Sequence, residues 1–129
     1  MRTFTIARLV RDRIVEQIIK AGNVPHWRVL SGEQYLQALK DKLVEEAQEM
    51  QGASGEDLID ELADVQEVVD SLLKMLDLTK EQLSETQQKK NKKNGPFEKR
   101  DYIDEVEVKD DSEWVHYYLK KPEKFPERS

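Results

Sequence analysis

The sequence contains no cysteine and only two histidines, His26 and His116, and this scarcity limits the metal chemistry open to the chain. Zinc and iron sites usually take thiolate or imidazole ligands, and neither histidine lies near the acidic motifs described below. Any metal site is therefore expected to use oxygen ligands. The lack of cysteine also fits a reducing cytosol.

Long apolar segments are also missing. The chain has no run of 18 apolar residues, as a membrane-spanning helix would need, and its first residues lack the pattern of a signal peptide. We therefore expect a cytoplasmic location and no membrane partner.

The size and composition predict one small domain. The chain has 129 residues, of which 37% are hydrophobic and 37% are charged, so its hydrophobic core should be thin. We expect a single domain over residues 1–129, with a helical core over about 8–100 and a C-terminal extension over about 101–129. A thin core favours self-association, as a homodimer or a dimer of dimers.

The net charge of −6 is distributed unevenly. Residues 31–78 carry thirteen acidic and three basic side chains, whereas residues 1–30 carry two acidic and six basic ones, and residues 79–100 carry three and seven. An acidic centre between two basic segments suits a metal-bound polyphosphate. Nucleic acid is not expected as a partner, because the acidic block would repel its backbone.

Two groups of carboxylates with helical spacing are the most informative motif: Glu45-Glu46-x-x-Glu49 and Glu61-x-x-Asp64. At 100° per residue, Glu46, Glu49 and Glu61 fall at the edges of apolar stripes. Four carboxylates within ~5 Å would repel by roughly 3 kcal/mol per pair at a dielectric near 20, so they should share a cation. Oxygen ligands favour Mg²⁺, with Mn²⁺ as a substitute. Any one such pair could equally be the solvated face of an amphipathic helix, but two pairs on neighbouring helices favour a metal site.

Capping signals and glycines predict four helices, over about residues 13–21, 32–51, 55–76 and 80–94. Their expected N-caps are Asp12, Ser31, Ser54 and Thr79, and the second and fourth start with a capping box, Ser31 with Gln34 and Thr79 with Gln82. Four helices joined by short loops predict an all-α fold built on a four-helix bundle.

The loop between the two acid-bearing helices is especially short, over residues 52–55. Helices joined by so short a loop are antiparallel neighbours, so the end of one lies beside the start of the next. We therefore expect Glu49 to approach Glu61.

The last thirty residues follow a different pattern. Tyr102, Asp104, Val106 and Val108 alternate along the chain as in a short strand, so the extension is expected to be irregular or β-like. An aromatic group follows, and we expect it to pack on the bundle or on a partner subunit. Its members are Trp114, Tyr117 and Tyr118.

Three further stretches accompany the acidic pairs: Leu9-Val10-Arg11-Asp12-Arg13-Ile14, Glu61-Leu62-Ala63-Asp64-Val65, and Lys90 followed by Asn94-Gly95-Pro96-Phe97. In this order the motifs resemble the MazG-like all-α nucleoside triphosphate pyrophosphohydrolases, which include dimeric dUTPase and phosphoribosyl-ATP pyrophosphohydrolase, and in particular their house-cleaning branch. The resemblance covers about residues 8–103. Where that branch has Arg-Gly-Gly-Phe, this chain has Asn94-Gly95-Pro96-Phe97.

The resemblance implies hydrolysis of an NTP or dNTP to the monophosphate and pyrophosphate. It also implies that Mg²⁺ is held by four carboxylates, those of Glu46, Glu49, Glu61 and Asp64. Glu49 or Glu45 would act as the general base for the attacking water. Glu49 is the better candidate, because the helical phase turns Glu45 away from the hairpin.

Basic side chains near the end of the fourth predicted helix could contact the phosphates. Lys90 is the first candidate, with Lys93 or Arg100 assisting, and Arg11 could also reach a phosphate. The alternative for the lysines is that they are solvated residues favoured by the dipole of the helix C-terminus.

Two other functions remain open at this point. Phosphoribosyl-ATP pyrophosphohydrolase activity cleaves the same kind of linkage and differs in what the base pocket accepts. A non-catalytic helical interaction module would use the acids only to solvate a hairpin.

Overall fold

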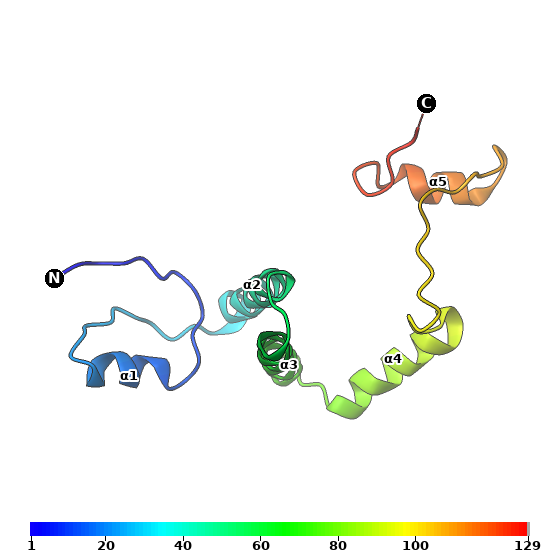
Figure 1. Ribbon diagram of the computed structural model, residues 1–129. Helices are drawn as coiled ribbons and strands as arrows, with labels where there is room; N and C mark the ends of the chain where they lie inside the picture. The colour runs from blue at the N-terminus through cyan, green and yellow to red at the C-terminus, as the bar shows by residue number, and fades with distance from the viewer. Residues whose placement is uncertain (129) are drawn as a thin grey trace. The chain divides into compact units, whose positions relative to one another are not determined.

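The computed structural model describes residues 1–128, so the last residue of the expected extension lies outside it. Its elements are α1 (Ile14–Lys20), α2 (Gly32–Gln51), α3 (Glu56–Met75), α4 (Lys80–Asn94) and α5 (Glu113–Leu119), shown in Figure 1. The chain forms two compact units, Met1–Lys90 and Asn91–Ser129, which are described separately.

The predicted all-α class is confirmed, because the residues that the structure describes contain helices and no strand. Residues 102–108 are irregular, which was one of the two alternatives expected for the extension, and the β-like alternative is wrong. Alternation of side chains is not enough to form a strand, which also needs a neighbouring strand to pair with its backbone. None of the helices within residues 1–128 is long and apolar enough to span a lipid bilayer.

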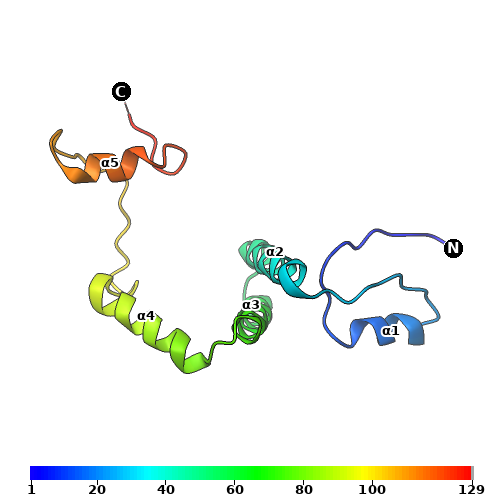
Figure 2. The same ribbon diagram turned by 180° about the vertical axis from the view of Figure 1, so that it is seen from behind.

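The first unit is built on a helical hairpin. Helices α2 and α3 have 20 residues each, are joined by residues 52–55, and lie side by side in both views (Figures 1 and 2). The expected pairing of the two acid-bearing helices is thus confirmed. Within residues 1–128, α2 and α3 are the pair of helices that packs extensively, and a complete four-helix bundle stays a prediction.

The side of α2 that faces α3 follows residues spaced three or four apart. Leu39 is 2% exposed, Leu43 and Met50 are half-buried, and Glu46 lies between them in the same series with 6% exposure. This spacing is that of a helix packed along another helix. A carboxylate therefore occupies a position that the pattern would assign to an apolar side chain.

Helix α3 has the same arrangement. Val65, Val68 and Leu72 are buried or half-buried at this spacing, and Glu61 lies one turn before Val65 on the same line. Glu61 was expected at the edge of the apolar stripe and is half-buried there, whereas Leu62 is 51% exposed. Leu62 stays exposed because the apolar band on α3 is wider than the strip that a single neighbouring helix can cover.

The helix ends agree with the sequence in part. The predicted capping box at α4 is confirmed: the Thr79 amide donates to Gln82 Oε1 at 2.8 Å, and the Gln82 amide donates to Thr79 Oγ1 at 3.1 Å. Ser31 is the N-cap of α2 but makes no side-chain capping hydrogen bond. The other two N-caps lie one residue later than predicted: Arg13 and Gly55 in place of Asp12 and Ser54.

The second unit contains α5 and its aromatic cluster. Helix α5 starts with a side-chain cap, since the Trp114 amide donates to Ser112 Oγ at 3.2 Å. Tyr117 and Tyr118 pack on Phe125, with ring centroids 5.8 and 5.1 Å away. The aromatic residues thus contact one another within this unit. Their expected packing on the bundle or on a partner stays a prediction.

Candidate metal centre

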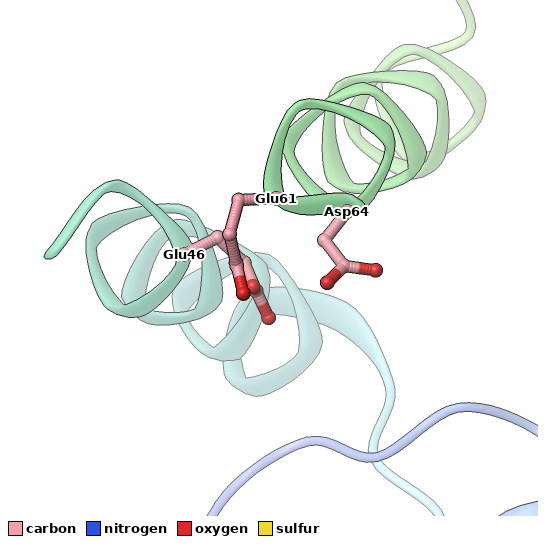
Figure 3. Close-up of side chains that lie close together, drawn as sticks. All are labelled: Glu46, Glu61 and Asp64. Atoms are coloured by element: carbon pink, nitrogen blue, oxygen red, sulfur yellow. The ribbon is translucent and has the colours of Figure 1, made fainter. Parts of the chain in front are cut away.

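Three of the four predicted metal-binding carboxylates meet between α2 and α3. Glu46 comes from α2, while Glu61 and Asp64 come from α3, and their carboxylates turn to the same side of the hairpin (Figure 3). One oxygen atom from each residue lies within 4.8 Å of the other two. Oxygen ligands of one Mg²⁺ are roughly 3–4 Å apart, given Mg–O distances of about 2.1 Å. Small side-chain rotations would therefore bring these three carboxylates into a metal-binding geometry.

Two of these carboxylates have buried oxygen atoms without a donor. Glu46 Oε2 and Glu61 Oε2 have no hydrogen-bond partner among the described residues. A buried acceptor of this kind costs about 1–3 kcal/mol or more, and a charged one costs most. A cation bound between the two helices would satisfy both atoms, so the residues present fit Mg²⁺ or Mn²⁺.

The environment of Glu46 opposes its negative charge. The pKa of Glu46 is raised from 4.5 to about 7, mainly by burial and also by the charge of Glu49, the nearby carboxyl of Glu61 and the charge of Asp64, while Lys42 acts in the opposite direction. At neutral pH and without a bound cation, Glu46 is thus partly protonated. Because metal ligands must be deprotonated, cation binding at this site should release a proton.

Glu45, the less favoured candidate for the general base, is held in ion pairs. Its Oε1 accepts a hydrogen bond from Arg8 Nη1 at 2.7 Å, and its Oε2 accepts one from Lys42 Nζ at 3.2 Å. Although burial raises the pKa of Glu45, these two cations outweigh it and lower the pKa below 4.5. A carboxylate that is neutralised in this way is a weak base.

Asp64 is also paired with an arginine. Arg11 Nη2 donates to Asp64 Oδ1 at 2.6 Å, across 53 residues of sequence. Arg11 was predicted to contact a phosphate, and the structure places it at the edge of the carboxylate group. Its role toward phosphate stays a prediction.

Glu49, the fourth predicted ligand and favoured base, lies beside the group rather than within it. The close set of oxygens consists of Glu46, Glu61 and Asp64, and Glu49 is exposed. Together with Glu61, Gly52 and Asp57 it lines a hollow of about 350 Å³ next to the turn of the hairpin. Its charge raises the pKa of Glu46, and its role as a ligand or general base stays a prediction.

The predicted phosphate-binding residues Lys90, Lys93 and Arg100 are exposed. Lys90 ends the first unit, whereas Lys93 and Arg100 belong to the second. Their contact with a substrate therefore stays a prediction.

Two residues at this site were not identified from the sequence. Lys42 lies 3.7 Å from Glu46 Oε1 and also pairs with Glu45, and its spacing of three and four residues from them was a detectable signal. Arg8 reaches Glu45 across 37 residues, and no local pattern predicts such a pair.

Comparisons with known proteins give little information on this site. The chain is 46% identical over 52 residues to an uncharacterized protein of Mycolicibacterium smegmatis, which corresponds to 40% of this chain and 53% of that protein. The chain thus spans about half the length of this curated relative. No family model and no solved structure matches it.

Proposed function

We propose that the chain is a Mg²⁺-dependent nucleoside triphosphate pyrophosphohydrolase, which cleaves an NTP or dNTP to the monophosphate and pyrophosphate. The observation that carries this proposal is the pair of buried, unpartnered oxygens of Glu46 and Glu61, two carboxylates that lie close together and close to Asp64. Carboxylates replace apolar residues in the interface between two helices there, and a structural role alone gives no reason for this. The resemblance of the motifs to MazG-like enzymes supports the choice of reaction.

Each acidic side chain has a separate task in this proposal. Glu46, Glu61 and Asp64 would hold the cation, and Glu49, which lies beside the group, would position the attacking water. When bound, Mg²⁺ neutralises charge on the polyphosphate and lowers the pKa of water at the site. The basic side chains Lys90, Lys93 and Arg100 are proposed to contact the phosphates.

Activity is tested with a panel of NTPs and dNTPs in Mg²⁺, scored by pyrophosphate release. We expect Glu46→Gln and Asp64→Asn to lose at least about a hundredfold in kcat/KM, because each removes a charged ligand from the site. Glu67→Gln is the matched control, since Glu67 is an exposed acid on α3 outside the group. Retained activity in the Glu46 and Asp64 variants would contradict the proposal, and so would equal loss in the control.

We also propose that the active form is a homodimer or a dimer of dimers in the cytoplasm. The hairpin leaves large apolar side chains exposed: Val44, Leu58, Ile59, Leu62 and Leu76. Covering them with the hairpin of a second copy would complete a four-helix bundle and remove this surface from water.

A further inference from the structure

Two arginines that precede α1 link the N-terminal segment to both helices of the hairpin. Arg8 Nη1 binds Glu45 Oε1 on α2 at 2.7 Å, and Arg11 Nη2 binds Asp64 Oδ1 on α3 at 2.6 Å. Residues 8–11, called here the arginine segment, thus reach the acidic side of the hairpin at two points. The contacts differ in one respect, because Asp64 belongs to the close carboxylate group and Glu45 does not.

The pair between Arg11 and Asp64 is direct but exchangeable. A 2.6 Å hydrogen bond between two charged groups is a short, charge-assisted contact. The side chains are 57% and 35% exposed, so water screens the pair and can replace either partner. By comparison, Lys42 stays 3.7 Å from Glu46, and the buried oxygens of Glu46 and Glu61 have no donor within the described chain.

We propose that Arg11 is a tethered counter-cation, which holds Asp64 while no divalent ion is bound and turns to a phosphate oxygen of the nucleotide once the ion arrives. This inference rests on the proposed function. A divalent ion bound at Asp64 would bring positive charge close to the guanidinium, and the repulsion would favour release of Arg11. The freed guanidinium has the planar fork that matches phosphate oxygens, and its exposure leaves it room to move.

This exchange predicts that Arg11 has opposite effects on metal binding in the absence and in the presence of nucleotide. Without nucleotide, Arg11 and the ion compete for Asp64, so Arg11 weakens ion binding. With a triphosphate present, Arg11 binds the ligand and no longer competes, so the nucleotide and the ion strengthen each other's binding. Such coupling is reciprocal and can be measured from either ligand.

The test measures Mn²⁺ binding to the full-length chain by electron paramagnetic resonance, alone and with a non-hydrolysable nucleoside triphosphate analogue. We expect Arg11→Gln to bind Mn²⁺ alone about threefold more tightly than the unmodified chain, as expected for the loss of one partly exposed ion pair. We expect the same variant to lose most of the tightening that the analogue causes.

Arg8→Gln is the matched control, because it removes the same charge from the same segment but acts on Glu45. We expect its Mn²⁺ affinity to change less than that of Arg11→Gln. Arg11→Lys keeps the charge and loses the planar fork, and it should retain weak Mn²⁺ binding but lose the coupling to the analogue. Arg11→Lys tests the coupling if Arg11→Gln does not fold.

The outcomes separate this inference from the proposed function. If the unmodified chain binds no Mn²⁺, the metal site itself is refuted and the exchange with it. If it binds Mn²⁺ but Arg11→Gln binds no more tightly, or either Arg11 variant keeps the full coupling, the exchange is refuted and the metal site stands. A purely structural role for Arg11 would lower the melting temperature and weaken Mn²⁺ binding together.

Discussion

At the scale of single residues, Glu46 is the unusual feature of this protein. Its position between Leu43 and Met50 on the packed side of α2 is one where an apolar residue is the rule, and it is 6% exposed. Its motif, Glu46 with Glu49, was visible in the sequence. The extent of its burial was not, because helical phase gives a direction but does not say which strip the neighbouring helix covers.

The raised pKa of Glu46 predicts how stability depends on pH without divalent ions. Its pKa is 4.5 in the unfolded chain and about 7 in the folded one, so the folded state binds more protons between these values. The free energy of unfolding should therefore fall as the pH rises from 5 to 8, by about 3 kcal/mol for this group.

Urea denaturation at a series of pH values in a chelating buffer measures this slope. Glu46→Gln cannot titrate at this position, so it should remove most of the decrease. An unchanged slope in the variant would show that other groups cause it.

Divalent ions should reverse this destabilisation. At pH 7.5, Mg²⁺ at about 100 times its dissociation constant should add roughly 2.7 kcal/mol to the free energy of unfolding, which a thermal melt would show as a rise of several degrees. Asp64→Asn should abolish the rise, while Glu67→Gln should keep it. A hairpin that serves only as an interaction module would give no rise in any of these proteins.

At the scale of elements, the sequence predicted four of the five helices within residues 1–128 and missed α5, which lies in the extension expected to be irregular or β-like. The ranges of α2, α3 and α4 could be predicted from capping residues and glycines, which act locally. The alternation over residues 102–108 left a β-like extension open, and no strand forms there because a strand depends on a partner that the local sequence does not specify. The sequence could not show which part of the wide apolar band on α3 is buried for a similar reason, since the packing of α2 decides this.

The turn of the hairpin depends on one glycine. Gly55 has φ 58° and ψ −128°, a conformation that side chains with a Cβ rarely adopt, whereas Gly52 has an ordinary helical conformation. Gly55→Ala should therefore lower the free energy of unfolding by about 1–3 kcal/mol. Gly52→Ala is the control and should change it by less than about 1 kcal/mol. Similar losses in urea denaturation for both variants would contradict this account.

At the scale of the whole molecule, self-association was expected from composition, and the exposed apolar side chains of the hairpin give it a specific surface. If two copies join through this surface, sedimentation velocity should find a mass of at least about twice the 15.1 kDa of one chain. Leu62→Gln should shift the protein toward the monomer, because it places an amide in the shared core.

Leu83→Gln is the matched control, since Leu83 is an exposed leucine of α4, outside the hairpin. It should leave the mass unchanged. A monomeric unmodified protein, or an equal response to both substitutions, would place the contact elsewhere.

The second unit shows where sequence patterns stop being informative at this scale. Lys93 and Arg100 could be chosen as phosphate contacts by residue type and order, but the pattern gives no position relative to the carboxylates. The aromatic residues were recognised as a cluster in the sequence. In the structure, the rings of Trp114, Tyr117, Tyr118 and Phe125 pack against one another.

The carboxylate group also lies at a particular height on the hairpin. Glu46 is five residues before the end of α2, and Glu61 is five residues after the start of α3. An ion bound at this position would cross-link α2 and α3 near the turn of the hairpin. Amide hydrogen exchange should then slow most in the last turns of α2 and the first turns of α3, while the far ends continue to fray as before.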